Sequence, residues 1–176
     1  MRICVVIALF LVVAANAISQ QLSSQTRAQA IAEAFSKHKS GVKEKHGVRI
    51  TKYKDVRSEP VVKQNIADYS GAYEVSDLGL VINIQVGTDG RVQASGNDNG
   101  RAFRLENARI EGALLTASKI YQDGTSETFE GAFLNRTARD SASDPGVTVF
   151  GLGVFLTAPV KSTGLTYEKI FYQLKK

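Results

Sequence analysis

From residue 69 to the C-terminus, hydrophobic and polar residues alternate in short runs that are separated by turn sequences. In the clearest run, residues 80–86, leucine, isoleucine or valine occupies every second position, which is typical of a strand with one buried face. Thr88-Asp89-Gly90 and Asp123-Gly124 are typical of hairpin turns. The whole pattern predicts about eight strands, over residues 69–75, 80–86, 91–95, 102–106, 114–121, 125–134, 147–157 and 165–174.

Strands at this spacing, joined by short turns, favour an antiparallel meander. A meander that closes into a barrel hides its strand edges completely. We therefore predict a mainly β fold: a single antiparallel up-and-down β-barrel of about eight strands with one N-terminal amphipathic helix, a two-sheet sandwich being the alternative. An eight-stranded barrel has an interior that its own side chains fill or that holds one small ligand.

The N-terminal helix is predicted over residues 23–39. Its narrow hydrophobic stripe recurs at helical spacing and consists of Ala28, Ile31, Ala32 and Phe35. Lys37 and Lys39 in the last turn, with Gly41 just past it, are typical of a helix C-terminus. Because a short helix is only marginally stable alone, the stripe must dock on another surface.

The run at residues 147–156 is hydrophobic at both alternating positions, so one face enters the barrel and the other needs cover. The face that needs cover carries Phe150, Leu152, Val154 and Leu156. We expect Ile31 and Phe35 of the helix to cover it, a second subunit that makes an oligomer through this strand being the alternative. Gly151 and Gly153 indicate a bend or a close backbone approach.

The first residues have the three parts of a cleavable export signal. Arg2 gives a positive start, residues 3–13 are almost wholly hydrophobic, and Ala15-Asn16-Ala17 places small residues before the cleavage point. The hydrophobic run is too short to cross a bilayer, which takes about 20 residues of helix. We predict a signal peptide over residues 1–17 and a secreted or periplasmic protein. Residues 18–66 are then the helix and a basic arm, and residues 67–176 the β-barrel domain.

The single cysteine, Cys4, lies inside that signal. Cleavage would leave a chain with no disulfide, no catalytic thiol and no cysteine-ligated zinc. No second hydrophobic stretch is long enough for a transmembrane anchor, so none is expected. A disulfide-free exported protein favours a bacterial periplasm or exterior, whereas a eukaryotic secretory route would make Asn135-Arg136-Thr137 a glycosylation sequon.

The net charge of +5 is concentrated near the N-terminus. Residues 18–66 contain ten Lys and Arg against four Asp and Glu, and eight of these cations fall within residues 37–57. Such an arm can hold an anionic surface such as phospholipid, lipopolysaccharide or an acidic glycan, while a solvated linker is the alternative. Nucleic acid is not expected as a partner, because the chain is exported. The candidate contact residues are Lys43, Lys45, Lys52 and Lys54.

The sequence lacks the usual catalytic and metal-binding patterns. His38 and His46 lie among lysines with no carboxylate placed to complete a metal site. There is no Gly-x-Ser-x-Gly motif. We therefore expect no catalytic residue, no metal and no cofactor. An enzyme would need a pocket that converges on Arg101, Arg104 or Tyr121 with a carboxylate within hydrogen-bond reach.

Tyr69-Ser70-Gly71-Ala72-Tyr73, the alternating run at 80–86 and Asp89-Gly90-Arg91-Val92 together resemble the opening of lipocalin-like small β-barrel domains. Similar openings head accessory domains beside serine β-lactamase-like hydrolases. The chain has no tryptophan, so the Gly-x-Trp signature of lipocalins is missing. The resemblance implies a barrel with an apolar interior site.

Two hypotheses for the function follow. The first is an exported, non-enzymatic, lipocalin-like barrel that binds a small apolar or amphipathic molecule. The second is a cell-envelope interaction module whose basic arm contacts an anionic surface while the barrel serves as a solid scaffold. The candidate ligand-binding residues of the barrel interior are Ile82, Ile84, Phe103, Leu115, Phe129, Phe133, Phe155 and Phe171.

Overall fold

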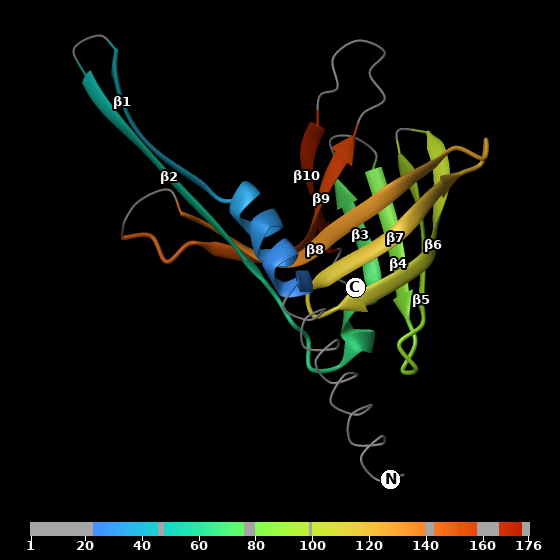
Figure 1. Ribbon diagram of the computed structural model, residues 1–176. Helices are drawn as coiled ribbons and strands as arrows, with labels where there is room; N and C mark the ends of the chain where they lie inside the picture. The colour runs from blue at the N-terminus through green and yellow to red at the C-terminus, as the bar shows by residue number, and fades with distance from the viewer. Residues whose placement is uncertain are drawn as a thin grey trace, which may run out of the picture.

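A computed structural model describes residues 23–45, 48–75, 80–98, 100–139, 143–157 and 166–173 of the chain (Figure 1). It begins with a helix over residues 23–34 and continues as strands, with one short 3-10 helix, η1, between the second and third strands. The elements are β1 (Lys37–Lys45), β2 (Val48–Pro60), η1 (Ile66–Tyr69), β3 (Gly71–Val75), β4 (Leu80–Val86), β5 (Val92–Asp98), β6 (Arg101–Glu111), β7 (Leu114–Tyr121), β8 (Ser126–Arg139), β9 (Val147–Thr157) and β10 (Thr166–Gln173).

Eight antiparallel strands, β3 to β10, curl into a half-barrel (Figure 1). The hydrogen-bonded order is β8-β7-β6-β5-β4-β3-β10-β9, and β9 also pairs with β8, so the pairings return to the strand from which they start. The link between β10 and β3 is short, joining Tyr172 to Glu74 and Gln173 to Tyr73. The predicted fold class, mainly β with about eight antiparallel strands and one N-terminal helix, is confirmed.

Aromatic side chains pack on one another in the main core of the curled sheet. Tyr69 of η1 stacks on Phe133 with ring centroids 4.2 Å apart, and Phe133 stacks in turn on Phe150 at 6.1 Å. The Tyr69 hydroxyl donates to the carbonyl of Gly112 (2.8 Å) and accepts from the backbone N–H of Lys63 (2.9 Å). One buried tyrosine therefore fastens η1 both to the segment after β2 and to the turn between β6 and β7.

The helix is shorter than the sequence predicts. Its helical backbone ends at residue 34, and Lys37, Lys39 and Gly41 belong to β1. Two contacts with β2 fix this end: the Ser58 hydroxyl donates to the Phe35 carbonyl (3.2 Å), and the Ser58 N–H donates to the Ser36 hydroxyl (2.9 Å). Pairing of β1 with β2 then overrides the local helix signal, because every residue of β1 has a partner in β2. Much of the predicted basic arm is thus a β-hairpin.

The helix docks on the outside of the sheet, as its stripe predicts. Ala28, Ile31, Ala32 and Phe35 are buried in a second, smaller core with Ala113, Leu114, Ala132 and Leu134. At Gly153 of β9, an added Cβ would lie 2.7 Å from Leu134 and 2.9 Å from the Phe35 ring. This close approach of Phe35 to the strand backbone favours a glycine at this position.

The expected orientation of β9 is wrong. Leu152 and Val154 lie inside the half-barrel, fully buried in its main core, and Phe150 packs against that core. Gly151 and Gly153 are among the outward positions, together with the exposed Val147 and Val149, and Phe35 covers Gly153. Phe35 therefore covers β9 on its glycine face, and the expectation that Ile31 and Phe35 cover the face of Phe150, Leu152 and Val154 is wrong. The side chain of Leu156 lies outside the described residues.

Strand β8 extends to Arg139, five residues past the end of the strand predicted at residues 125–134. Its first half pairs with β7, its second half pairs along the same edge with β2, and its other edge pairs with β9. A three-stranded extension, β2–β8–β9, therefore leaves the half-barrel, and the β1–β2 hairpin projects from it (Figure 1).

Candidate functional site

The structure brings together most of the residues predicted to line the barrel interior. The predicted residues Ile82, Ile84, Phe103, Leu115, Phe129 and Phe133 are buried in the main core. Phe155 and Phe171 belong to β9 and β10, but their side chains lie outside the described part of the chain.

Three of these residues line a small cavity. Ile82, Phe103 and Phe129 form its walls together with Leu80, Asn97, Asp98 and Lys119. The cavity measures about 10 Å³, which is room for roughly one water molecule. Pockets for drug-sized ligands measure about 300–1,000 Å³. Around this cavity, the side chains of the protein itself occupy the interior.

A lysine lies inside the half-barrel at the edge of that cavity. Lys119 is only 4% exposed, and its Nζ donates to Asp98 Oδ2 (2.6 Å) and to the Tyr121 hydroxyl (2.5 Å). The same Nζ lies 4.5 Å from the ring centroids of Phe103 and of Tyr121. A buried charge is retained only when it is paired and hydrogen-bonded, and these contacts meet that condition.

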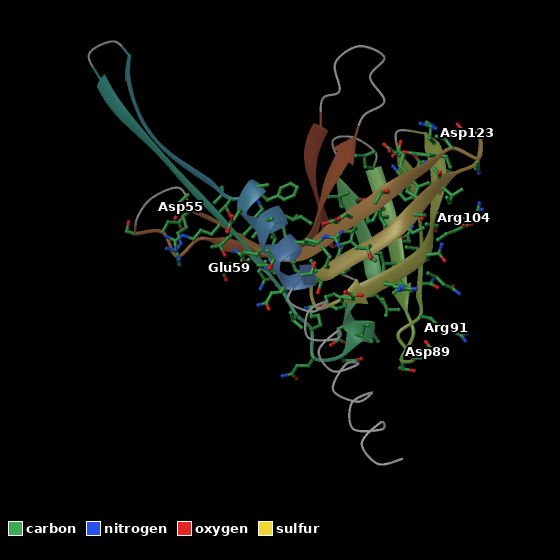
Figure 2. All side chains as sticks on the ribbon, viewed as in Figure 1. Asp55, Glu59, Asp89, Arg91, Arg104 and Asp123 are labelled. Atoms are coloured by element: carbon green, nitrogen blue, oxygen red, sulfur yellow. The ribbon has the colours of Figure 1, made fainter. Side chains whose placement is uncertain are left out.

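An enzyme was expected to need a pocket that converges on Arg101, Arg104 or Tyr121 with a carboxylate within hydrogen-bond reach. Arg101 stacks 3.9 Å over the Tyr121 ring and donates to Asp123 (3.0 Å), and the Tyr121 hydroxyl lies 3.0 Å from Asp98. Burial, followed by the negative charge of Asp98, raises the pKa of Tyr121. Tyr121 is therefore a neutral hydrogen-bond donor near pH 7. Arg104 lies on the outside of the sheet, paired with Glu106, and takes no part (Figure 2).

Sequence reasoning missed Lys119, although one signal was available. Leu115, Ala117, Lys119 and Tyr121 occupy alternate positions of one strand, so a lysine interrupts an otherwise inward-facing series. Its partner Asp98 belongs to β5, two strands away, and only the folded sheet shows that the two meet.

The register of the β1–β2 hairpin brings the predicted cationic residues together. Residues paired directly across an antiparallel ladder share a face, and faces alternate along each strand. The pairs Lys39↔Lys54 and Gly41↔Lys52 lie on one face, with Lys43↔Ile50 and Lys45↔Val48 farther out. Lys37, opposite Val56, belongs to the same face. We call these positions the lysine face: Lys37, Lys39, Lys43, Lys45, Lys52 and Lys54.

The opposite face of the hairpin has a mixed composition. It carries the pairs His38↔Asp55, Ser40↔Tyr53, Val42↔Thr51 and Glu44↔Arg49. His46 lies outside the described residues. Within the ranges that the structure describes, no three histidine, cysteine, aspartate or glutamate residues are grouped to hold a metal ion, and no helix is long and hydrophobic enough to span a membrane.

Comparison of the chain with protein-family models, with curated proteins and with solved structures finds no match. The feature of the expected lipocalin-like barrel that the structure shows is the strongly curled antiparallel sheet.

Proposed function

We propose that this protein is an exported, non-enzymatic interaction module whose β1–β2 hairpin binds an anionic surface of the cell envelope. The observation that carries the proposal is the register of the hairpin, which assigns six lysines from two strands to one face. The hairpin projects away from the half-barrel, so that face has room to meet an extended surface (Figure 1).

Clustering of like charges favours a binding role. Like charges directly opposite one another across a β-ladder are destabilising, and Lys39 lies directly opposite Lys54. An anionic partner removes that cost. Each lysine near an anionic membrane surface contributes about 1 kcal/mol. Four such residues together therefore change affinity by about 4 kcal/mol, which is about a thousandfold.

Protection of a strand edge is the competing explanation for these lysines, because β1 is the end strand of the sheet. Edge protection also covers Lys52 and Lys54, because β2 pairs with β8 only from Asp55 to Pro60 and residues 48–54 of β2 therefore form an edge as well. It does not account for the placement of the lysines of both strands on the same face.

The test uses the purified protein and vesicles of phosphatidylglycerol in phosphatidylcholine. Binding should weaken about tenfold or more between 50 and 300 mM salt, because the attraction is screened. The variant K43S/K45S/K52S/K54S should bind about a thousandfold more weakly, while K43R/K45R/K52R/K54R should bind as the wild type does. Binding that is insensitive to salt and to the serine substitutions would contradict the proposal.

A small amphipathic ligand in the barrel is the second candidate function, favoured by the convergence of Ile82, Phe103 and Phe129 on one cavity. Occupancy requires one aromatic side chain to move, because the cavity holds about one water. Phe129→Ala should therefore tighten binding of an anilinonaphthalenesulfonate dye. Phe133→Ala, a matched control whose side chain is buried but does not line that cavity, should not. Equal effects of the two substitutions would exclude the cavity as a ligand site.

A further inference from the structure

The inner face of the sheet continues beyond the half-barrel along β8. One face of β8 carries Phe129, Phe133, Asn135 and Thr137, which occupy alternate positions. The face that contacts the core therefore continues into the β2–β8–β9 extension. Here the face becomes polar and carries a groove of about 190 Å³. The groove is lined by Asp55, Arg57, Glu59, Asn135, Thr137, Arg139 and Thr148.

The groove is separate from the lysine face. On β2 its residues are Asp55, Arg57 and Glu59, whereas Lys52 and Lys54 occupy the alternate positions, which belong to the other face. Across the strands, Asp55 pairs with Arg139, Arg57 with Thr137 and Glu59 with Asn135. Figure 2 shows Asp55 and Glu59 along β2, within the extension.

Two guanidinium groups reach this groove from neighbouring strands. Asp55 is 4% exposed, and its Oδ2 lies 3.3 Å from Arg57 Nε, while the side chain of Arg57 is 68% exposed. Arg57 is thus held by a buried carboxylate and remains open to a ligand. The Nε of Arg139 is buried without a hydrogen-bond partner in the described part of the chain. The exposed guanidinium of Arg57 is suited to bidentate binding of a carboxylate, and Arg139 adds a second positive charge to the lining.

Neutral polar groups complete the lining. The hydroxyls of Thr137 and Thr148 lie 2.7 Å apart, and one hydrogen bond between them leaves a donor and further lone pairs unused. Glu59 and Asn135 are exposed and opposite one another. Two carboxylates in the lining disfavour a densely charged phosphate, whereas a ligand with a single carboxylate and several hydroxyls matches both kinds of group.

We infer that this groove binds a uronate unit of an acidic glycan, with Arg139 and Arg57 on the sugar carboxylate and the two threonines on its hydroxyls. The groove is smaller than the roughly 300–1,000 Å³ pockets of drug-sized ligands, which suits one or two sugar units. The site goes beyond the proposed function of the hairpin and does not depend on it, because the two lie on opposite faces of β2.

Calorimetric titration of the purified protein with trigalacturonate, and with neutral galactotriose as the matched sugar, tests the inference. Trigalacturonate should bind saturably, and galactotriose at least tenfold more weakly. Arg139→Gln and, separately, the double change T137V/T148V should each weaken trigalacturonate binding at least tenfold. Arg91→Gln, which changes an exposed arginine in the β4–β5 turn, is the control and should have no effect.

The outcomes separate the two sites. Trigalacturonate binding that survives Arg139→Gln and T137V/T148V but is lost in K43S/K45S/K52S/K54S would overturn the groove and leave the hairpin proposal standing. Equal binding of the charged and the neutral sugar, or binding of neither, would also overturn the groove. In each case, the vesicle assay reports independently on the hairpin.

Discussion

The Nζ of Lys119 lies 2.6 Å from the carboxylate of Asp98, and this pair joins β7 to β5 inside the half-barrel. The two partners are unequally buried, because the side chain of Lys119 is 5% exposed and that of Asp98 is 28% exposed. Loss of one partner therefore does not cost the same as loss of the other.

Asp98→Asn should destabilise the protein more than Lys119→Met. The first change leaves a buried ammonium without its counter-charge, which costs about 3 kcal/mol. The second leaves a carboxylate that already reaches water, and we expect about 1 kcal/mol. Urea unfolding of both variants and of the double variant measures these costs. The double variant should lose less stability than the two single losses added together. A larger loss of stability in Lys119→Met than in Asp98→Asn would contradict the deeper burial of Lys119.

Tyr121 should make stability fall at alkaline pH. Its pKa in the folded protein is raised above the unfolded value of about 10, first by burial and then by Asp98. The folded state therefore retains a proton that the unfolded chain releases. The contribution is fully present below pH 10 and is lost as the pH rises towards the folded pKa. Between pH 9 and pH 11, Tyr121→Phe should lose less free energy of unfolding than the wild type. If the free energies of unfolding of the wild type and of Tyr121→Phe fall equally with pH, Tyr121 does not titrate differently in the folded and unfolded states.

Two glycines should differ in their tolerance of alanine. At Gly96 an added Cβ would lie 2.3 Å from the backbone carbonyl oxygen of Val81, which has no freedom to move away. At Gly153 the nearest atoms belong to the side chains of Leu134 and Phe35, which can shift. Overpacking usually costs about 1–3 kcal/mol, so Gly96→Ala should lower the melting temperature more than Gly153→Ala. The melting temperatures of the two variants decide this, and equal values would contradict the close approach at Gly96.

The Phe35 side chain should hold the helix on the sheet. Phe35→Ala removes the contact with Gly153 and a large part of the smaller core, which should cost about 3 kcal/mol. The helix should then become the first site of limited proteolysis, while the half-barrel stays resistant. Cleavage that begins inside β4 or β7 instead would show that this docking contributes little.

Several strands were predictable from the sequence because local signals bound them on both sides. Residues 80–86, 114–121 and 147–157 form strands with the predicted bounds, since alternation or a hydrophobic run identifies each and turn residues end it. The end of the helix was not predictable in this way. The backbone at Lys37 and Lys39 is fixed by pairing with β2, and that contact is distant in the sequence.

The candidate sites also combine features that the local sequence predicts with features that depend on contacts between distant strands. The four arm lysines were identified from charge alone, but their common face depends on the register of β1 with β2. The polar groove was missed because its residues come from three strands and none of them forms a motif. The inward face of β9 was also mistaken, because alternation defines two faces without saying which of them meets the core.

The most direct test of the central claim moves lysines between faces without changing the charge of the hairpin. The variant K43S/K52S/S40K/T51K removes two lysines from the lysine face and adds two at positions on the opposite face. Its binding to phosphatidylglycerol vesicles should weaken about thirtyfold or more at 100 mM salt, since about 1 kcal/mol per lysine is lost from the contacting face. Binding equal to that of the wild type would show that total charge alone governs the interaction, and it would contradict a role for the lysine face.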